Sequence, residues 1–135
     1  MSNETVSLQS LLVPSKSATV DYPGLEGFKL DLSFLAREEL VKIRKKATKV
    51  EFKNRQPVET LNDDLFLKLY VDGCIKGWEG LTFSHLATLA PVDISKYKAD
   101  DTLAYSPENA LYLMKSSSDF DAFISETVTH LANFQ

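Results

Sequence analysis

The chain has 135 residues, of which 44% are hydrophobic and 25% charged, and its formal net charge at pH 7 is −4. This ordinary globular composition excludes collagen-like, low-complexity and largely disordered chains, and the acidic balance argues against a protein that coats nucleic acid nonspecifically. A single cysteine excludes an internal disulfide, and no apolar run reaches the roughly 20 residues that span a bilayer. Because the N-terminus also lacks a signal-peptide pattern, we expect a soluble intracellular protein.

Residues 1–17 are predicted to form a flexible N-terminal arm, and residues 18–135 to form a single mostly helical domain. The arm is largely polar, and its apolar residues include Leu8, Leu11, Leu12 and Val13. Terminal segments of this kind are poorly ordered unless something holds them. The arm is therefore expected to fray, or to order on a partner.

Apolar and polar residues alternate over residues 18–22 and again over residues 28–32. This period of two is typical of half-buried strands, and Pro23-Gly24 between them suits a tight turn. The pattern predicts an antiparallel strand pair. Because an isolated pair is only marginally stable in water, we expect it to pack on the helices that follow.

Apolar residues three and four apart predict a helix over residues 36–50. Its apolar stripe consists of Ala36, Leu40, Ile43, Ala47 and Val50. Its opposite face is basic and consists of Arg37, Lys42, Arg44, Lys45, Lys46 and Lys49. Residues 53–57 break the pattern and are expected to form a loop.

A second helix is predicted from about residue 63 to Trp78, and it is apolar on nearly every side. A helix of this kind is a buried central helix, and Trp78 at its end is interpreted as a core residue.

After a short helical segment that Pro91 ends, Ser106-Pro107-Glu108 is a strong helix start, with a capping hydroxyl, a proline and an acid.

The last helix is predicted to start at Ser118, which forms a capping-box pattern with Asp121, and its apolar face runs to Phe134. All these elements together predict a mainly α fold. We expect a helical bundle-like domain with an N-terminal antiparallel β-strand pair.

Few residues suit catalysis or metal binding. His85 and His130 are interpreted as solvated surface residues, and Cys74 as a small, inert core residue. Widely spaced histidines and one cysteine do not make a zinc site, and no glycine-rich phosphate loop is present. The sequence therefore predicts no catalytic, metal-binding or cofactor-binding residues, and a protein that is not an enzyme.

Charge is distributed unevenly along the chain. Residues 37–55 carry a net charge of +5, whereas residues 1–36 carry −2 and residues 56–135 carry −7. A basic helix in an acidic protein is compatible with a solvated face, with head-to-tail self-association through opposite patches, or with RNA or DNA binding. We favour these in that order.

The order of elements resembles the small tail assembly chaperones of long-tailed bacteriophages. The resemblance runs from Tyr22 to Phe134 and is most specific in two stretches. These are Gly77-Trp78-Glu79-Gly80-Leu81-Thr82 and Tyr105-Ser106-Pro107-Glu108-Asn109-Ala110. One departure is Ala36, where a helix-capping serine is expected before Arg37.

The resemblance implies a non-enzymatic protein without cofactors that binds the phage tape measure protein, keeps it soluble and supports assembly of the tail tube. The tail tube protein and further copies of this chain are additional candidate partners; a membrane is not expected, and nucleic acid is disfavoured. Such a protein is expected in the host cell cytoplasm and not in the mature virion. The alternatives are a structural tail or head-completion protein retained in the virion, and a small nucleic-acid-binding regulator.

Three surfaces are candidates for contact with a partner: the arm, the basic helix and the end of the last helix. The predicted partner-binding residues are Leu11, Leu12, Lys42, Arg44, Lys45, Lys46 and Phe134.

Overall fold

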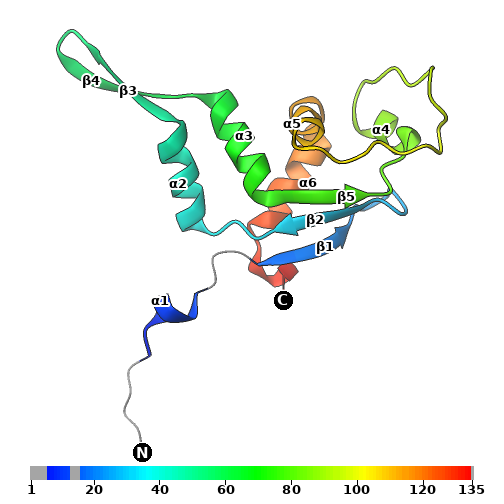
Figure 1. Ribbon diagram of the computed structural model, residues 1–135, viewed down its shortest axis with the longest axis horizontal. Helices are drawn as coiled ribbons and strands as arrows, with labels where there is room; N and C mark the ends of the chain where they lie inside the picture. Colours follow the sequence, from blue (N-terminus) through cyan, green and yellow to red (C-terminus); the bar gives the residue numbers. More distant parts are fainter. Residues whose placement is uncertain (1–5, 13–15, 135) are drawn as a thin grey trace, which may run out of the picture.

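The computed structural model describes residues 6–12 and 16–134 and shows an α+β fold. Over these residues, two antiparallel sheets of three and two strands accompany the helices (Figure 1). The predicted mainly α, bundle-like fold is therefore wrong. Two segments that were predicted to be helix or loop pair instead as strands.

The three-stranded sheet has the order β1 (Ser17–Asp21), β2 (Lys29–Ser33), β5 (Ile75–Glu79), and both strand pairs are antiparallel. The first pair confirms the predicted N-terminal strands. The Tyr22 N–H donates to the Phe28 carbonyl oxygen at 2.9 Å, which closes the connection between these strands.

Strand β5 corrects the predicted long central helix, because α3 (Asp63–Cys74) ends before Trp78 is reached. Ile75 and Trp78 are three residues apart, so they keep the spacing of a helix. A register shift in the β2–β5 pairing nevertheless places both on the buried face, Trp78 opposite Leu30 and Ile75 opposite Leu32. A β-bulge of this kind explains how a strand can imitate helical spacing.

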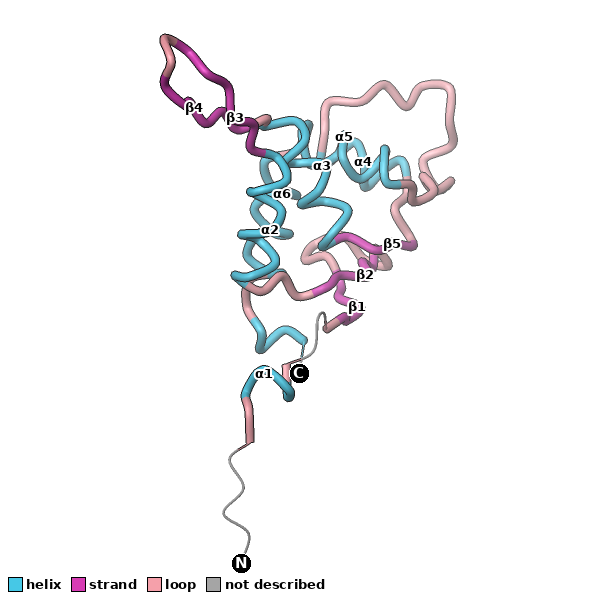
Figure 2. Tube along the Cα trace, turned by 60° about the vertical axis from the view of Figure 1, so that its left-hand side comes forward, coloured by secondary structure: helices cyan, strands magenta, loops and turns pink. Residues whose placement is uncertain are grey.

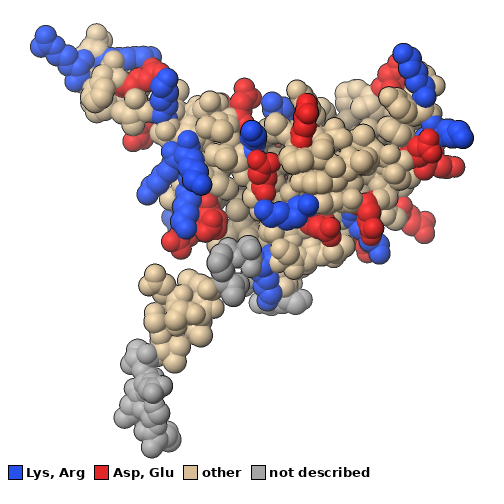
Figure 3. Space-filling model, in the orientation of Figure 1, with Lys and Arg blue, Asp and Glu red and all other residues tan. Residues whose placement is uncertain are grey.

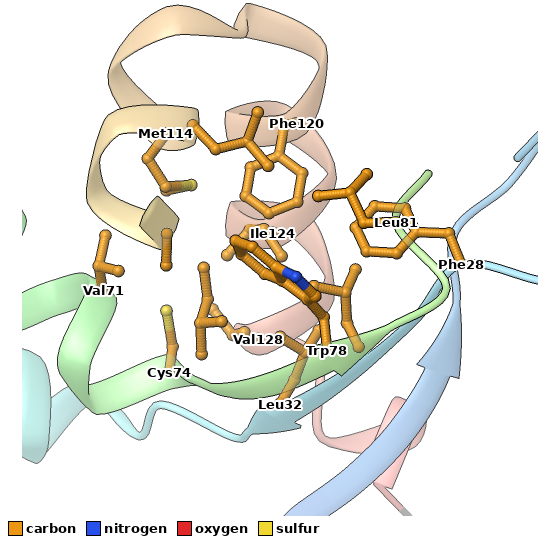
Figure 4. Packing of buried hydrophobic residues seen from close by; sticks show 14 of the residues in the cluster. Phe28, Leu32, Val71, Cys74, Trp78, Leu81, Met114, Phe120, Ile124 and Val128 are labelled. Carbon is orange, nitrogen blue, oxygen red and sulfur yellow. The ribbon is translucent and has the colours of Figure 1, made fainter. Parts of the chain in front are cut away.

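Helices α3, α5 (Pro107–Ser116) and α6 (Ser118–Val128) pack over one face of this sheet, and α4 (Phe83–Leu89) follows β5 (Figures 1 and 2). The core lies between the two layers (Figure 4). The largest fully buried side chains are Phe28, Phe120, Leu30, Leu32, Ile75, Leu81, Ile124, Val71 and Val128. Trp78 is also buried and meets Phe28 edge to face, which confirms it as a core residue.

The two-stranded sheet is a hairpin that the sequence interpretation missed. Helix α2 (Arg37–Ala47) ends three residues earlier than predicted, and β3 (Thr48–Lys53) and β4 (Gln56–Leu61) follow in place of the helix end and the loop. Both residues of its turn, Asn54 and Arg55, have positive φ. This conformation matches the twist of a tight hairpin.

The helix starts are only partly as predicted. Ser106 caps α5, since its hydroxyl accepts from the Asn109 N–H at 3.0 Å, as its pattern predicted. Helix α6 is capped by Ser117 and not by Ser118, because Ser117 Oγ accepts from the Phe120 N–H at 3.1 Å. The same helix ends at Val128, well before the predicted end of its apolar face.

In the N-terminal arm, α1 (Leu8–Leu11) is a single helical turn. Residues 1–5 and 13–15 of the predicted arm lie outside the described residues. Ser17, which was assigned to the arm, is the first residue of β1 and its hydroxyl lies 2.9 Å from that of Ser33.

Candidate partner-binding surface

Helix α2 contacts the rest of the protein mainly along one side, where it packs on α3. Its apolar residues Leu40 and Ile43 pack against the hydrophobic core, and Ala47 is buried. The predicted residues Lys42, Arg44, Lys45 and Lys46 are all exposed on the remaining surface. Figure 3 shows Lys and Arg side chains gathered over this helix. The apolar stripe therefore holds the helix in place and leaves its cations in water.

The structure separates these four cations into different neighbourhoods. Arg44 and Lys45 line a hollow between α2 and the hairpin, whereas Lys46 lines a groove on the side facing α3. Lys42 pairs with Glu39 at 3.3 Å. Of the predicted basic residues, only Arg44 and Lys45 are thus brought together beside the hairpin.

The β3–β4 hairpin projects from the body (Figures 1 and 2). In its register Val50 lies opposite Glu59 and Phe52 opposite Pro57, so these four side chains share one face. Val50 is 53% exposed and Phe52 75% exposed. Neighbouring exposed apolar side chains, unlike scattered single ones, mark a candidate interaction site.

This face of the hairpin continues onto α2. Val41, Arg44, Lys45, Thr48, Val50 and Glu59 together line a shallow hollow of about 440 Å³. Phe52 extends the same face toward the tip of the hairpin. We call these seven residues the α2–hairpin surface.

The cations of the α2–hairpin surface are not neutralised within the chain. Over the described residues, no carboxylate lies within 4.0 Å of Arg44 or Lys45. The ion pairs nearest in sequence are Lys42–Glu39 and Lys49–Glu51, both exposed and 3.3 Å long. The α2–hairpin surface therefore holds two cations, Arg44 and Lys45, against one carboxylate, Glu59, which leaves it a net charge of +1.

The predicted arm residues are also exposed. Leu11 and Leu12 are 65% and 60% exposed, and Val6 and Leu8 are similarly accessible. Figures 1 and 2 both show α1 away from the hairpin. The structure therefore does not bring the arm together with the α2–hairpin surface.

Phe134 was predicted to be an exposed contact residue, and this is wrong. It is only 5% exposed and packs against Phe34, with ring centroids 5.8 Å apart. The chain turns after α6 into the 3₁₀ helix η1 (Leu131–Phe134), where the Asn133 side-chain amide donates to the Thr127 carbonyl oxygen at 3.1 Å. This turn carries Phe134 back to the body.

Three residues have side chains of the types used in catalysis: Cys74, His85 and His130. Cys74 is buried, and loss of solvation raises the pKa of its thiol to about 12, which leaves it protonated and unreactive at neutral pH. His85 Nε2 lies 2.9 Å from the Glu26 carbonyl oxygen, and His130 is exposed after α6.

The described part of the chain holds neither a cluster of metal ligands nor a membrane-length apolar helix. It contains no group of three or more His, Cys, Asp or Glu side chains placed to hold a metal ion. In residues 6–12 and 16–134, no helix has the length and apolar character needed to cross a membrane.

The sequence analysis did not identify five residues of this surface: Val41, Thr48, Val50, Phe52 and Glu59. Val50 had been assigned to the apolar stripe of a longer helix. A signal was nevertheless present, because Val50 and Phe52 alternate with charged residues and are followed by Asn54, a residue that tolerates positive φ.

Comparison with known proteins places the chain in a family. A family model described as YdaY prophage protein matches residues 34–135, which include α2, the hairpin and all the helices that follow. No curated protein and no solved structure gives a significant match. The family description indicates a phage-derived protein and names no activity. Because the match covers well over half of its length, the chain belongs to the YdaY prophage protein family.

Proposed function

We propose that this protein is a phage tail assembly chaperone, not an enzyme, that binds the tape measure protein. The observation that carries the proposal is the α2–hairpin surface, where exposed Val50 and Phe52 lie beside the unneutralised Arg44 and Lys45. The phage origin of the family and the resemblance to tail assembly chaperones support the same function.

The proposed mechanism consists of covering apolar surface and adding net charge, and it involves no chemical reaction. A tape measure protein is long and helical, and its apolar side has no partner until the tail tube forms around it. Copies of this chain would cover that apolar side through their own apolar surface. Their net charge of −4 per copy would keep the complex soluble in the host cytoplasm.

Co-expression with the tape measure protein of the same prophage tests the proposal. We expect a soluble complex that co-purifies, and we expect tape measure protein expressed alone to be largely insoluble. The double variant Val50→Ser/Phe52→Ser should lose the complex, whereas Tyr112→Ser, which changes an exposed aromatic residue on α5, should retain it. Equal solubility of the tape measure protein with and without this chain would refute the function.

The alternative of a structural protein differs in its final location. Mass spectrometry of purified phage particles should not detect this chain if it acts as a chaperone, since the chaperone leaves before the tail is complete. Detection in stoichiometric amounts would favour a tail or head-completion component.

A nucleic-acid-binding function is favoured by one feature, the basic tip of the hairpin at Lys53 and Arg55, since two-stranded ribbons can enter DNA grooves. Glu51 and Glu59 on the same ribbon weaken this alternative, because they would repel phosphates. It predicts a gel mobility shift of DNA or RNA at low salt that is lost as salt rises.

A further inference from the structure

We propose that the α2–hairpin surface takes an amphipathic helix whose apolar ridge is flanked by Asp and Glu side chains. The inference rests on the proposed function, because it names the kind of tape measure segment that this surface would take. It commits to a helix of another protein, not to a second copy of this chain or to nucleic acid.

The apolar half of the recognition comes from Val41, Val50 and Phe52. Val41 and Val50 line the hollow between α2 and the hairpin, and Phe52 extends it on the same face of the hairpin. All three are exposed, so their apolar surface is available to a partner. An amphipathic helix typically covers an apolar hollow of this kind with a row of apolar side chains at helical spacing.

The acidic flank is inferred from charge. Arg44 and Lys45 line the same hollow, and in the described part of the chain neither has a carboxylate within 4.0 Å. Residues 37–55 carry +5, whereas residues 56–135 carry −7. An acidic helix is therefore attracted to this surface and repelled by most of the remaining protein, which also fixes its position.

Other occupants fit the surface less well. The apolar arm of a second copy has no charged residue between Val6 and Leu12, so it would leave Arg44 and Lys45 without counter-charges. Nucleic acid has no apolar ridge to cover the exposed side chains of Val50 and Phe52.

Three synthetic helical peptides test the inference directly. All carry the same leucine ridge, and its flanking positions are Glu in the first, Gln in the second and Lys in the third. Binding to the intact protein is measured by fluorescence anisotropy at low and high salt. We expect the Glu peptide to bind about tenfold more tightly than the Gln peptide, the Lys peptide to bind most weakly, and salt to reduce these differences.

Two double variants test the charged and the apolar contributions to binding separately. Arg44→Glu/Lys45→Glu should reverse the order so that the Lys peptide binds most tightly. Val50→Ser/Phe52→Ser should weaken the binding of all three peptides at least tenfold. Matched controls are Lys96→Glu/Lys98→Glu in the loop before α5, and Tyr112→Ser on α5, neither of which should change the order. Circular dichroism establishes that each variant is folded.

The inference is overturned if the three peptides bind equally, if the charge reversal leaves their order unchanged, or if duplex DNA or a second copy of the chain displaces the Glu peptide. These results are distinct from the test of the proposed function. If the peptides behave as expected while the tape measure protein is not kept soluble, the recognition stands and the chaperone function fails. If the tape measure protein co-purifies while the peptides do not discriminate, the chaperone function stands and this inference fails.

Discussion

Gly80 occupies a position where only glycine fits. Its φ is +73°, and a Cβ added there would overlap the Gly27 carbonyl oxygen. Gly80→Ala should lower the free energy of unfolding by about 3 kcal/mol, since backbone strain and overlap with rigid backbone act together. Urea denaturation checks this. Gly24→Ala is the matched control, because its φ is +82° but nothing lies within 4 Å of the added Cβ, so its cost should be about 1 kcal/mol. Equal losses in the two variants would contradict the argument.

Cys74 is expected to make the protein less stable as the pH rises through the alkaline range. Burial raises the pKa of its thiol from 9.0 to about 12, so the folded state keeps the proton that the unfolded state releases. This contribution to stability is complete below about pH 9 and is lost as pH rises toward about 12. Between these limits, wild type should lose about 1.4 kcal/mol more per pH unit than Cys74→Ala. Parallel pH profiles of unfolding for the two proteins would contradict the prediction.

The start of α6 depends on a single hydroxyl group. Ser117 is buried and accepts from the Phe120 N–H, whereas its neighbour Ser118 is exposed. Ser117→Ala should lower the free energy of unfolding by about 1 kcal/mol because one orphan N–H loses its acceptor. Ser118→Ala should leave it nearly unchanged. Thermal and urea denaturation of both variants measure these changes. A larger loss of unfolding free energy for Ser118→Ala would show that Ser118 is the cap, as the sequence pattern predicts.

Over the whole molecule, stability is expected to be distributed unevenly. The sheet β1–β2–β5 and helices α3, α5 and α6 share one hydrophobic cluster, so Trp78 fluorescence and far-ultraviolet circular dichroism should report the same unfolding midpoint. The hairpin contacts mainly itself, so its amide protons should exchange through local opening at a lower free energy than those of β2. Amide hydrogen exchange followed by mass spectrometry tests this, and equal protection in β3 and β2 would contradict it.

Local patterns predicted the elements that depend on neighbours in sequence. The strands β1 and β2 alternate strictly, and Ser106-Pro107 marks the start of α5, so both were recognised. Strand β5 was missed because Ile75 and Trp78 keep helical spacing, and only pairing with β2 through a bulge makes them a strand. The hairpin was missed because Val50 also continues the helical spacing of Leu40, Ile43 and Ala47, although Val50 and Phe52 alternate with charged residues.

Of the seven residues of the α2–hairpin surface, the sequence analysis had named two. The cations Arg44 and Lys45 were recognised from charge, which requires no knowledge of the fold. Their apolar neighbour Phe52 was not recognised, because only the hairpin register places it on the same face as Val50. The expectation that Phe134 is exposed was wrong, because its position near the end of the chain does not reveal the turn after α6. That turn buries Phe134 against the body.

The amino-acid sequence by itself determined the charge distribution, the first strand pair and the start of α5, because each depends on composition or on residues a few positions apart. The tertiary structure alone decided that the fold is α+β, and that Val41, Val50 and Arg44 line one hollow. The physical reason is that strand pairing and helix packing join distant segments. Their energies depend on which surfaces meet and not on the local pattern of either segment.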